Sequence, residues 1–350
     1  MSISWWILFN TSVAVYAVIA VGATLRRVGW LTEEADQSLL RLVIRVLYPA
    51  LIFSIVSNNP ALKQAGNLLL APLIGFGTIA LGLGLAGAVG RLPMRWNGLT
   101  SDRQRRTFAA CVGIYNYGYI PIPLVKLLFG DATLGVLFVH NVGAELAVWT
   151  LGVLLLSGHL GRDKGSGTVC AEHPEGRSGK RYLTPFPVWL SGMLNAPTIA
   201  IVLALAVNFL GAAGLLPECL AKAVEWLGQA AIPMSMVLIG AVLADEMRPG
   251  EQSPTRAQGA KLVAWSLLLR LGLLPLGFLL LAMALPCSIE LKRVVVIQAA
   301  MPAATFPIVL ARHYGGDPGV GVRVALGTAI VSLITIPLWV PAGMHWLGIS

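Results

Sequence analysis

Long apolar segments alternate with short polar segments along most of the chain. A membrane-spanning helix needs about 20 mostly apolar residues, and windows of that length identify ten candidates. The candidates are residues 5–25, 38–57, 68–90, 107–129, 134–157, 188–210, 219–244, 259–285, 293–314 and 320–345. The pattern predicts an all-α integral membrane protein with ten transmembrane helices.

Composition agrees with a membrane location. The chain is 56% hydrophobic and only 12% charged, whereas soluble domains average about 25% charged residues. Its net charge of +9 would indicate nucleic-acid binding in a soluble protein. Here the basic residues lie between the apolar segments, where they suit anionic lipid headgroups. We therefore expect membrane lipid, and no nucleic acid, as a partner.

The basic residues also predict an orientation. Most of the 25 lysines and arginines follow the first, third, fifth, seventh and ninth apolar segments. Loops rich in Lys and Arg face the cytoplasm. We therefore expect an even number of spans, with both termini outside.

The cysteines indicate neither a disulfide framework nor a metal cage. They are scattered, without a CxxC pair, at Cys111, Cys170, Cys219 and Cys287. A closed zinc site takes four ligands, and Cys170 and His173 with His159 supply only three. We read this group as a coincidence within a loop and predict no metal and no cofactor.

The chain contains an internal duplication. "NTSVAVYAVIAVGATLRRVGWL" from Asn10 matches "NAPTIAIVLALAVNFLGAAGLL" from Asn195, and "FGDATLGV" from Phe129 matches "GGDPGVGV" from Gly315. The offset is about 185 residues. The predicted domains are a first five-helix repeat at 1–157, a charged, Gly-rich cytoplasmic linker at 158–187, and a second repeat at 188–350. Five is odd, so the second repeat enters the membrane from the opposite side, as in many secondary transporters.

Prolines interrupt the fourth and ninth segments at matching places. In "IYNYGYIPIPLV" we expect a break at residues 119–123, and in "AAMPAATFPIVL" a related break. Proline removes a hydrogen-bond donor, and irregular backbone is tolerated in a membrane only where protein or a cavity covers it. The breaks are expected to cross near the midplane. Their half-helix N-termini would then present free N–H groups to an anion.

The predicted substrate site combines the two breaks with neutral donors from Asn116 and Thr305. Its residues are Asn116, Tyr117, Tyr119, Pro121, Pro123, Pro302, Thr305 and Pro307. The alternative is that the prolines only kink packed helices. The repeat-related pair favours a binding site.

Two further features lie inside apolar segments. Glu145 and His140 lie in the fifth segment, where an ionisable residue is a functional candidate. Glu145 either carries a coupling proton, with His140 as a second candidate, or forms a buried pair with Arg270 of the eighth segment. The third segment contains six glycines, which predict close helix packing. They are Gly75, Gly77, Gly82, Gly84, Gly87 and Gly90.

Several motifs resemble the auxin efflux carrier family, which includes plant PIN-formed carriers and bacterial carboxylate permeases. The motifs are "YPALIFSIVS", "NYGYIPIPLVKLLFG", "IPMSMVLIG" and the Pro-containing ninth segment. The resemblance implies a fold like that of bile-acid/sodium symporters. Helices one, two, six and seven would form a scaffold, and the others a mobile transport domain. It also implies crossover prolines at Pro121 and Pro307, a role for Asn116, a homodimer, and a bacterial inner membrane with periplasmic termini.

The leading functional hypothesis is a secondary transporter that moves a small organic anion, a carboxylate, by alternating access. An arsenite-type permease of related fold is an alternative, with Cys111 as its one indication. A membrane-embedded enzyme using His140, Glu145 or Cys111 is the alternative from another class. The chain contains no HExxH or GxSxG motif, so we expect no enzyme.

Overall fold

A computed structural model describes residues 5–158, 195–246 and 256–349. Within these ranges the chain is helical, apart from turns and one isolated β-bridge. Residues 159–187 of the predicted linker, together with His159, Cys170 and His173, lie outside the described part.

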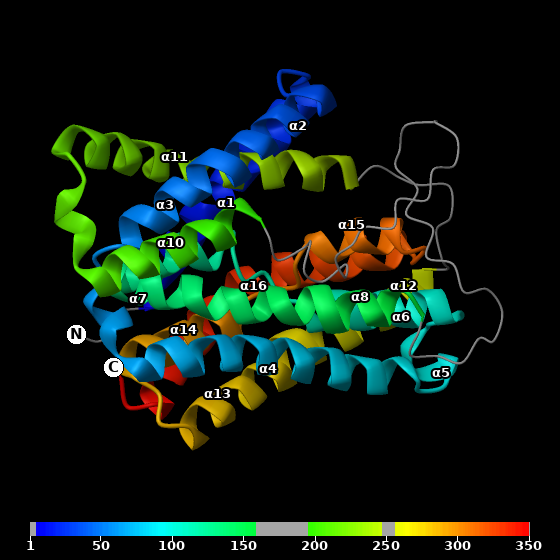
Figure 1. Cartoon of the computed structure of the whole chain (residues 1–350). Helices are drawn as coiled ribbons and strands as arrows, with labels where there is room; N and C mark the ends of the chain where they lie inside the picture. The colour runs from blue at the N-terminus through cyan, green and yellow to red at the C-terminus, as the bar shows by residue number, and fades with distance from the viewer. Residues whose placement is uncertain (1–4, 159–194, 247–255, 350) are drawn as a thin grey trace.

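The helices of the first half precede residue 158 (Figure 1). They are α1 (Trp5–Val28), α2 (Glu33–Leu42), η1 (Val43–Leu47), α3 (Tyr48–Val56), η2 (Pro60–Lys63), α4 (Ala65–Gly90), α5 (Met94–Asn97), α6 (Asp102–Gly113), α7 (Pro121–Ala147), η3 (Val148–Gly152) and α8 (Val153–Leu156). The second half contains α10 (Ala196–Leu210), η4 (Ala212–Leu215), α11 (Glu218–Glu246), α12 (Arg256–Leu267), η5 (Leu268–Leu273), α13 (Leu274–Ala284), α14 (Ile289–Ala300), α15 (Phe306–His313) and α16 (Pro318–Trp346). The segments η1, η3 and η5 are π-helical, whereas η2 and η4 are 3₁₀-helical.

Seven stretches of the described residues are long and apolar enough to cross a membrane, fewer than the ten predicted. They are Phe9–Val28, Glu34–Val56, Ala65–Gly90, Pro121–Leu156, Glu218–Asp245, Gln258–Ala284 and Pro318–Trp346. The predicted fourth and ninth segments are absent from this set because each is divided into shorter helices. Of the predicted sixth segment, the structure describes the 15-residue apolar helix Ala196–Leu210.

Both divided segments have the same construction. α6 ends at Gly113 and α7 begins at Pro121, while α14 ends at Ala300 and α15 begins at Phe306. The first break lies ahead of Pro121, earlier than the predicted 119–123. A proline at the first helical positions needs no N–H and already has a helical φ, so it starts a helix more readily than it interrupts one.

A tight turn connects the fourth segment to the fifth. Gly130 has φ 75° and ψ −170°, so the residues from Pro121 to Ala147 form two helices that meet there. Only glycine adopts this conformation without strain. Lys126 pairs with Asp131 across the turn at 3.1 Å. Asn59 Nδ2 donates to the carbonyl of Asp131 at 2.8 Å, which ties the turn to the start of η2.

Close packing of α4 on α7 requires Gly75. A Cβ atom at this position would lie 2.1 Å from the carbonyl oxygen of His140. Gly82 meets α6 in a similar way, with 2.6 Å to the Gly113 oxygen. Gly77 faces open space. The glycines of the third segment therefore divide into a packed set and an unpacked set.

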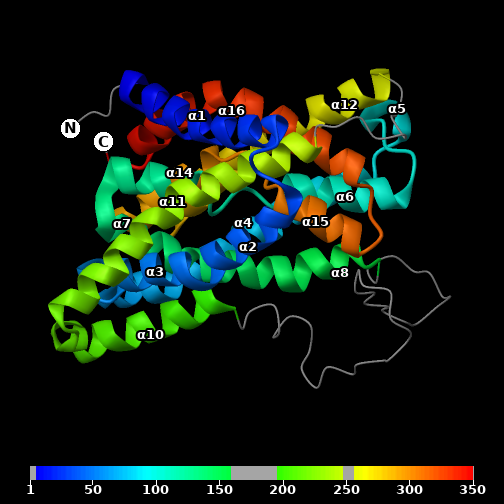
Figure 2. The same ribbon diagram turned by 90° about the horizontal axis from the view of Figure 1, so that it is seen from above.

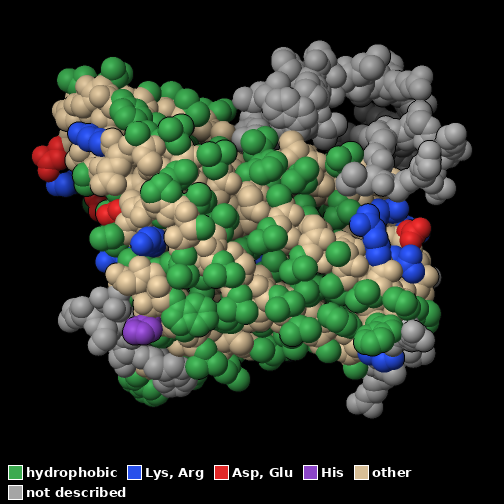
Figure 3. Space-filling view, turned by 90° about the horizontal axis from the view of Figure 1, so that it is seen from below, with side chains coloured by type: hydrophobic (Ala, Val, Ile, Leu, Met, Phe, Trp, Pro, Cys, Tyr) green, Lys and Arg blue, Asp and Glu red, His purple; other side chains and the backbone are tan. Residues whose placement is uncertain are grey.

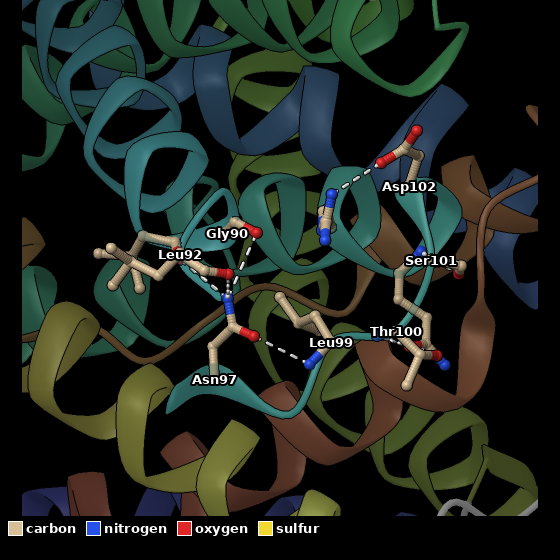
Figure 4. A network of polar contacts seen from close by, with 10 residues as sticks. Gly90, Leu92, Asn97, Leu99, Thr100, Ser101 and Asp102 are labelled. Atoms are coloured by element: carbon tan, nitrogen blue, oxygen red, sulfur yellow. Dashed lines mark hydrogen bonds and ion pairs between the residues drawn. The ribbon is translucent and has the colours of Figure 1, made fainter. Parts of the chain in front are cut away.

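The turn between α4 and α6 sets the position of one divided segment (Figure 4). Asn97 Nδ2 donates to the carbonyls of Val89 and Gly90 at the end of α4 and to that of Leu92 just beyond it, at 3.0–3.3 Å. Its Oδ1 accepts from the Leu99 N–H at 3.0 Å. Ser101 then caps α6 by accepting from the Gln104 N–H at 3.3 Å. Side-chain caps of this kind satisfy donors that a helix start leaves free.

The helices run roughly lengthwise between two ends of the molecule. The start of α1 and the end of α16 lie at the same end in two perpendicular views (Figures 1 and 2). On the face shown in Figure 3, most charged side chains lie toward the two ends, and hydrophobic side chains cover the middle. The most thoroughly buried elements are α6 and α14, whose inner halves are buried at every position.

Candidate functional site

The two breaks meet in the interior of the protein and pair as short antiparallel strands. Tyr115 and Ala303 form a β-bridge. The Asn116 N–H donates to the Pro302 carbonyl at 2.8 Å, and the Ala304 N–H donates to the Ile114 carbonyl at 3.0 Å. We call residues 114–120 and 301–305 the crossing. Their mutual bonds satisfy backbone groups that would otherwise be unpaired away from water.

Asn116 holds the turn that precedes α7. Its Oδ1 accepts from the N–H of Tyr119 at 3.0 Å and from that of Ile120 at 3.4 Å. Pro121 and Pro123 have no N–H to offer. The donors expected to face an anion at the start of α7 are therefore largely occupied. Thr305 occupies the N-cap position of α15, but its side chain makes no capping bond.

A cavity of about 340 Å³ adjoins the crossing. The crossing forms one wall, and α3 with η1, α7 with η3, and the start of α10 form the others. Its lining is Ile44, Tyr48, Ile52, Tyr115, Asn116, Tyr117, Gly118, Tyr119, Ile122, Phe138, Asn141, Val142, Glu145, Trp149, Asn195, Pro197, Thr198, Ile201, Ala304, Thr305 and Phe306. Aromatic side chains and neutral polar groups dominate this surface. Glu145 is the one acidic or basic side chain in it.

The predicted site residues divide between the cavity wall and the packed interior. Those in the wall are Asn116, Tyr117, Tyr119, Thr305 and Glu145. Those outside the wall are Pro121, Pro123, Pro302, Pro307 and His140, all of which are buried. The prolines determine the backbone path of the crossing without reaching the cavity, and the residues next to them in the chain line it.

Glu145 bonds to a residue of the second half within the cavity wall. Its Oε2 accepts from Asn195 Nδ2 at 3.2 Å. No ion pair between Glu145 and Arg270 occurs in the described part of the chain, so the predicted alternative of a Glu145–Arg270 pair is wrong. Arg270 instead contacts main-chain carbonyls of the ninth segment. Glu145 is thus left as a half-buried carboxylate at the cavity wall.

An amide network joins α7, α14 and the crossing. Asn141 Nδ2 donates to the Tyr117 carbonyl at 2.9 Å, and Gln298 Nε2 donates to the same carbonyl at 3.2 Å and to Asn141 Oδ1 at 3.1 Å. His140 Nδ1 lies 3.3 Å from that Oδ1. His140 is fully buried, and its Nε2 has no partner in the described structure. His140 therefore supports the wall from behind.

Sequence reasoning missed the π-helical segments. Ile44 in η1 and Trp149 in η3 line the cavity, and Arg270 in η5 contacts the crossing. A π-helical turn re-aims the side chains around it and is frequent at functional sites. A π-helical turn leaves no clear mark on the periodicity of apolar residues. The one available signal was Arg270, a charged residue within an apolar segment, which marks η5.

Comparison with known proteins identifies the family of the chain. The sequence profile of a family described as "Membrane transport protein" matches residues 7–340. The chain is 28% identical over 332 residues to an uncharacterized transporter of Methanothermobacter thermautotrophicus, covering 94% of this chain and 96% of the relative. It is 21% identical over 376 residues to auxin efflux carrier component 8 of Arabidopsis thaliana, covering 96% and 97%. An uncharacterized transporter of Methanocaldococcus jannaschii is 23% identical over 330 residues, covering 93% of this chain and 95% of the relative. The chain is an integral membrane protein that belongs to this membrane transport family, the auxin efflux carrier family that its motifs resemble.

Proposed function

We propose that the protein is a secondary transporter that moves a small organic anion, a carboxylate, by alternating access. The observation that carries this proposal is the antiparallel crossing of two broken spans beside a cavity of about 340 Å³. Broken helices that meet at the interface of repeats form the substrate sites of many secondary transporters. We infer that ten spans form two inverted five-helix repeats, with the described breaks at matching positions.

The packing supports a division into a scaffold and a mobile domain. α1 packs along α11, and α3 packs on α10 and α11. α4 packs on α6 and α7, while α14 packs on α7, α13 and α16. The cavity lies between α3 and α10 on one side and α7 with the crossing on the other. Movement of one group against the other would expose this cavity to alternate sides of the membrane.

The cavity lining fits an acid with an apolar body. Aromatic rings such as those of Tyr119, Trp149 and Phe306 supply apolar contact area. The Thr305 hydroxyl and the Asn116 amide supply neutral donors. Because the hydroxyl and the amide carry no net charge, they bind an anion weakly enough for it to dissociate.

Glu145 imposes a condition on an anionic substrate. A second carboxylate in a small cavity repels the first unless one of them is protonated. We propose that Glu145 accepts a proton when the substrate binds, which couples transport to the proton gradient. The other titratable groups of the cavity wall are the phenols of Tyr48, Tyr115, Tyr117 and Tyr119. The hydrogen-bond partner of Glu145, Asn195, is neutral.

The test is a stability and uptake screen of the purified protein with mono- and dicarboxylates. A ligand that binds only the folded state raises its melting temperature, and uptake into proteoliposomes shows transport. Thr305→Val removes one hydroxyl from the cavity at nearly constant volume. It should weaken binding by about 1 kcal/mol, roughly fivefold. Thr24→Val removes an exposed hydroxyl that bonds only the Ala20 carbonyl of α1, and serves as the control.

The expected result is a carboxylate that stabilises the parent and the Thr24 variant equally, and the Thr305 variant less. The proposal fails if no carboxylate stabilises the parent, or if Thr305→Val leaves both the ligand-induced shift and the uptake unchanged.

A further inference from the structure

Arg270 places a fully buried positive charge directly behind the crossing. It lies in η5, on the eighth segment, with 0% exposure. Its Nε donates to the Met301 carbonyl at 2.9 Å. Its Nη2 donates to the carbonyls of Ala299 at 3.1 Å and Gln298 at 3.3 Å. These three carbonyls belong to the C-terminal end of α14 and the first residue of the crossing.

The carbonyls that Arg270 contacts form a negative pole. The last turn of a helix leaves carbonyl groups without intrahelical partners, and the helix dipole places a partial negative charge there. α14 ends in the protein interior, where water does not reach these groups. Arg270 satisfies them and neutralises the pole. The rings of Tyr115 and Phe278, at 4.9 and 5.1 Å from its Cζ, stack on the guanidinium.

No carboxylate neutralises Arg270 in the part of the chain that the structure describes. None of the ion pairs found there includes Arg270, and its Nη1 has no hydrogen-bond partner. Burial of an uncompensated cation costs several kcal/mol. The negative helix end, its carbonyls and the aromatic rings therefore stabilise the buried charge of Arg270, and through these bonds the side chain holds the crossing.

Helix ends of this kind are cation sites in some secondary transporters. Unwound carbonyls and half-helix C-terminal ends coordinate Na⁺ in several such folds. We propose that Arg270 is a fixed internal cation that takes the place of a dissociable alkali cation at the end of α14. Folding and substrate binding then require no Na⁺ or K⁺ at the crossing. The transport part of this inference rests on the proposed function, whereas the stability part does not.

The proposal predicts that removal of the side chain creates a cation requirement. In Arg270→Ala the carbonyls of Ala299 and Met301 lose their donor beside a space of guanidinium size, while the Gln298 carbonyl keeps only the Met301 N–H at 3.3 Å. A small cation that enters this space should stabilise the folded state, by an amount that grows with the logarithm of its concentration above the dissociation constant. Arg270→Lys retains the charge with fewer donors and should need less added cation.

The experiment measures melting temperatures of the purified full chain in choline chloride, with NaCl, KCl or guanidinium chloride added at equal low concentrations. The parent should melt at the same temperature in choline and sodium. Arg270→Ala should melt lower in choline and regain part of the loss with guanidinium or an alkali cation. Arg293→Ala is the control, because Arg293 stacks on Phe129 at 5.3 Å and bonds no carbonyl of the crossing.

Three results would overturn the proposal. The first is a higher melting temperature of the parent in sodium than in choline. The second is an Arg270→Ala variant that melts in choline at the same temperature as the parent. The third is an Arg270→Ala variant whose lowered melting temperature no added cation raises. If Arg270→Ala does not fold, the sodium response of the parent and the cation response of Arg270→Lys decide the question. None of these measurements uses a substrate, so a failed carboxylate screen and a failed cation test remain distinguishable.

Discussion

Asn116→Ala should destabilise the protein through the backbone as well as weaken the substrate site. Its Oδ1 accepts two N–H groups, at 3.0 and 3.4 Å, and the side chain is only 6% exposed. Removal leaves both donors without an acceptor in a buried place, which costs about 1–3 kcal/mol. An exposed helix cap is worth about 1 kcal/mol. The buried location therefore makes the turn bonds of Asn116 more costly to lose than a helix cap at the surface.

The matched variants are Asn116→Asp and Thr32→Ala. Aspartate keeps an oxygen acceptor for the N–H groups of Tyr119 and Ile120 but lacks the amide donor. Thr32 caps α2 at an exposed position by accepting from the Ala35 N–H at 3.3 Å. Unfolding in mixed micelles should rank stability as parent, Asn116→Asp, Thr32→Ala and Asn116→Ala, in descending order. Both Asn116 variants should bind the carboxylate found in the screen less tightly.

A stability of Asn116→Ala equal to that of the parent would refute the role of Asn116 in holding the turn. If Thr32→Ala were more damaging than Asn116→Ala, the reasoning from burial would be wrong. If Asn116→Asp bound substrate as the parent does, the amide would have no part in recognition.

Three other predictions use the same protein. Gly75→Ala should destabilise it by about 1–3 kcal/mol through overpacking against α7, whereas Gly77→Ala, which faces open space, should not; equal unfolding midpoints would contradict this. Glu145→Gln should flatten the pH dependence of proteoliposome uptake, and superimposable profiles of variant and parent would reject a proton-carrying role. A membrane-impermeant maleimide should label the exposed Cys219 in intact cells, because the loop before α11 is predicted to lie outside, and labelling only after cell lysis would reverse the proposed orientation.

The divided helices could be predicted because proline acts locally. Pro121 and Pro307 lack an N–H group, so an interruption near each follows from the residue alone. The exact limits did not follow, since a proline near the start of a helix and one at a kink look alike in sequence. The structure places both prolines in first turns, with the irregular residues ahead of them.

The contacts behind the crossing could not be predicted in the same way. Arg270 and Met301 are 31 residues apart, and Glu145 and Asn195 are 50 apart. Which long-range partner a buried polar group takes depends on the packing of whole helices. Opposite charge suggested Glu145 as the partner of Arg270. Main-chain carbonyls at a helix end are also negative partners, but every residue has one, so the sequence does not reveal which carbonyls are used.

The turn at Gly130 has a mechanical consequence. Gly130 alone separates the short helix that starts at Pro121 from the helix that carries Glu145, and Asn59 bonds the turn between them. We therefore expect the two helices on either side of Gly130 to move together about a bend that Asn59, at the start of η2, holds. A tilt of either helix is passed to the other without slack, so a change in charge at Glu145 and a shift of the backbone around Asn116 are expected to occur as a single motion.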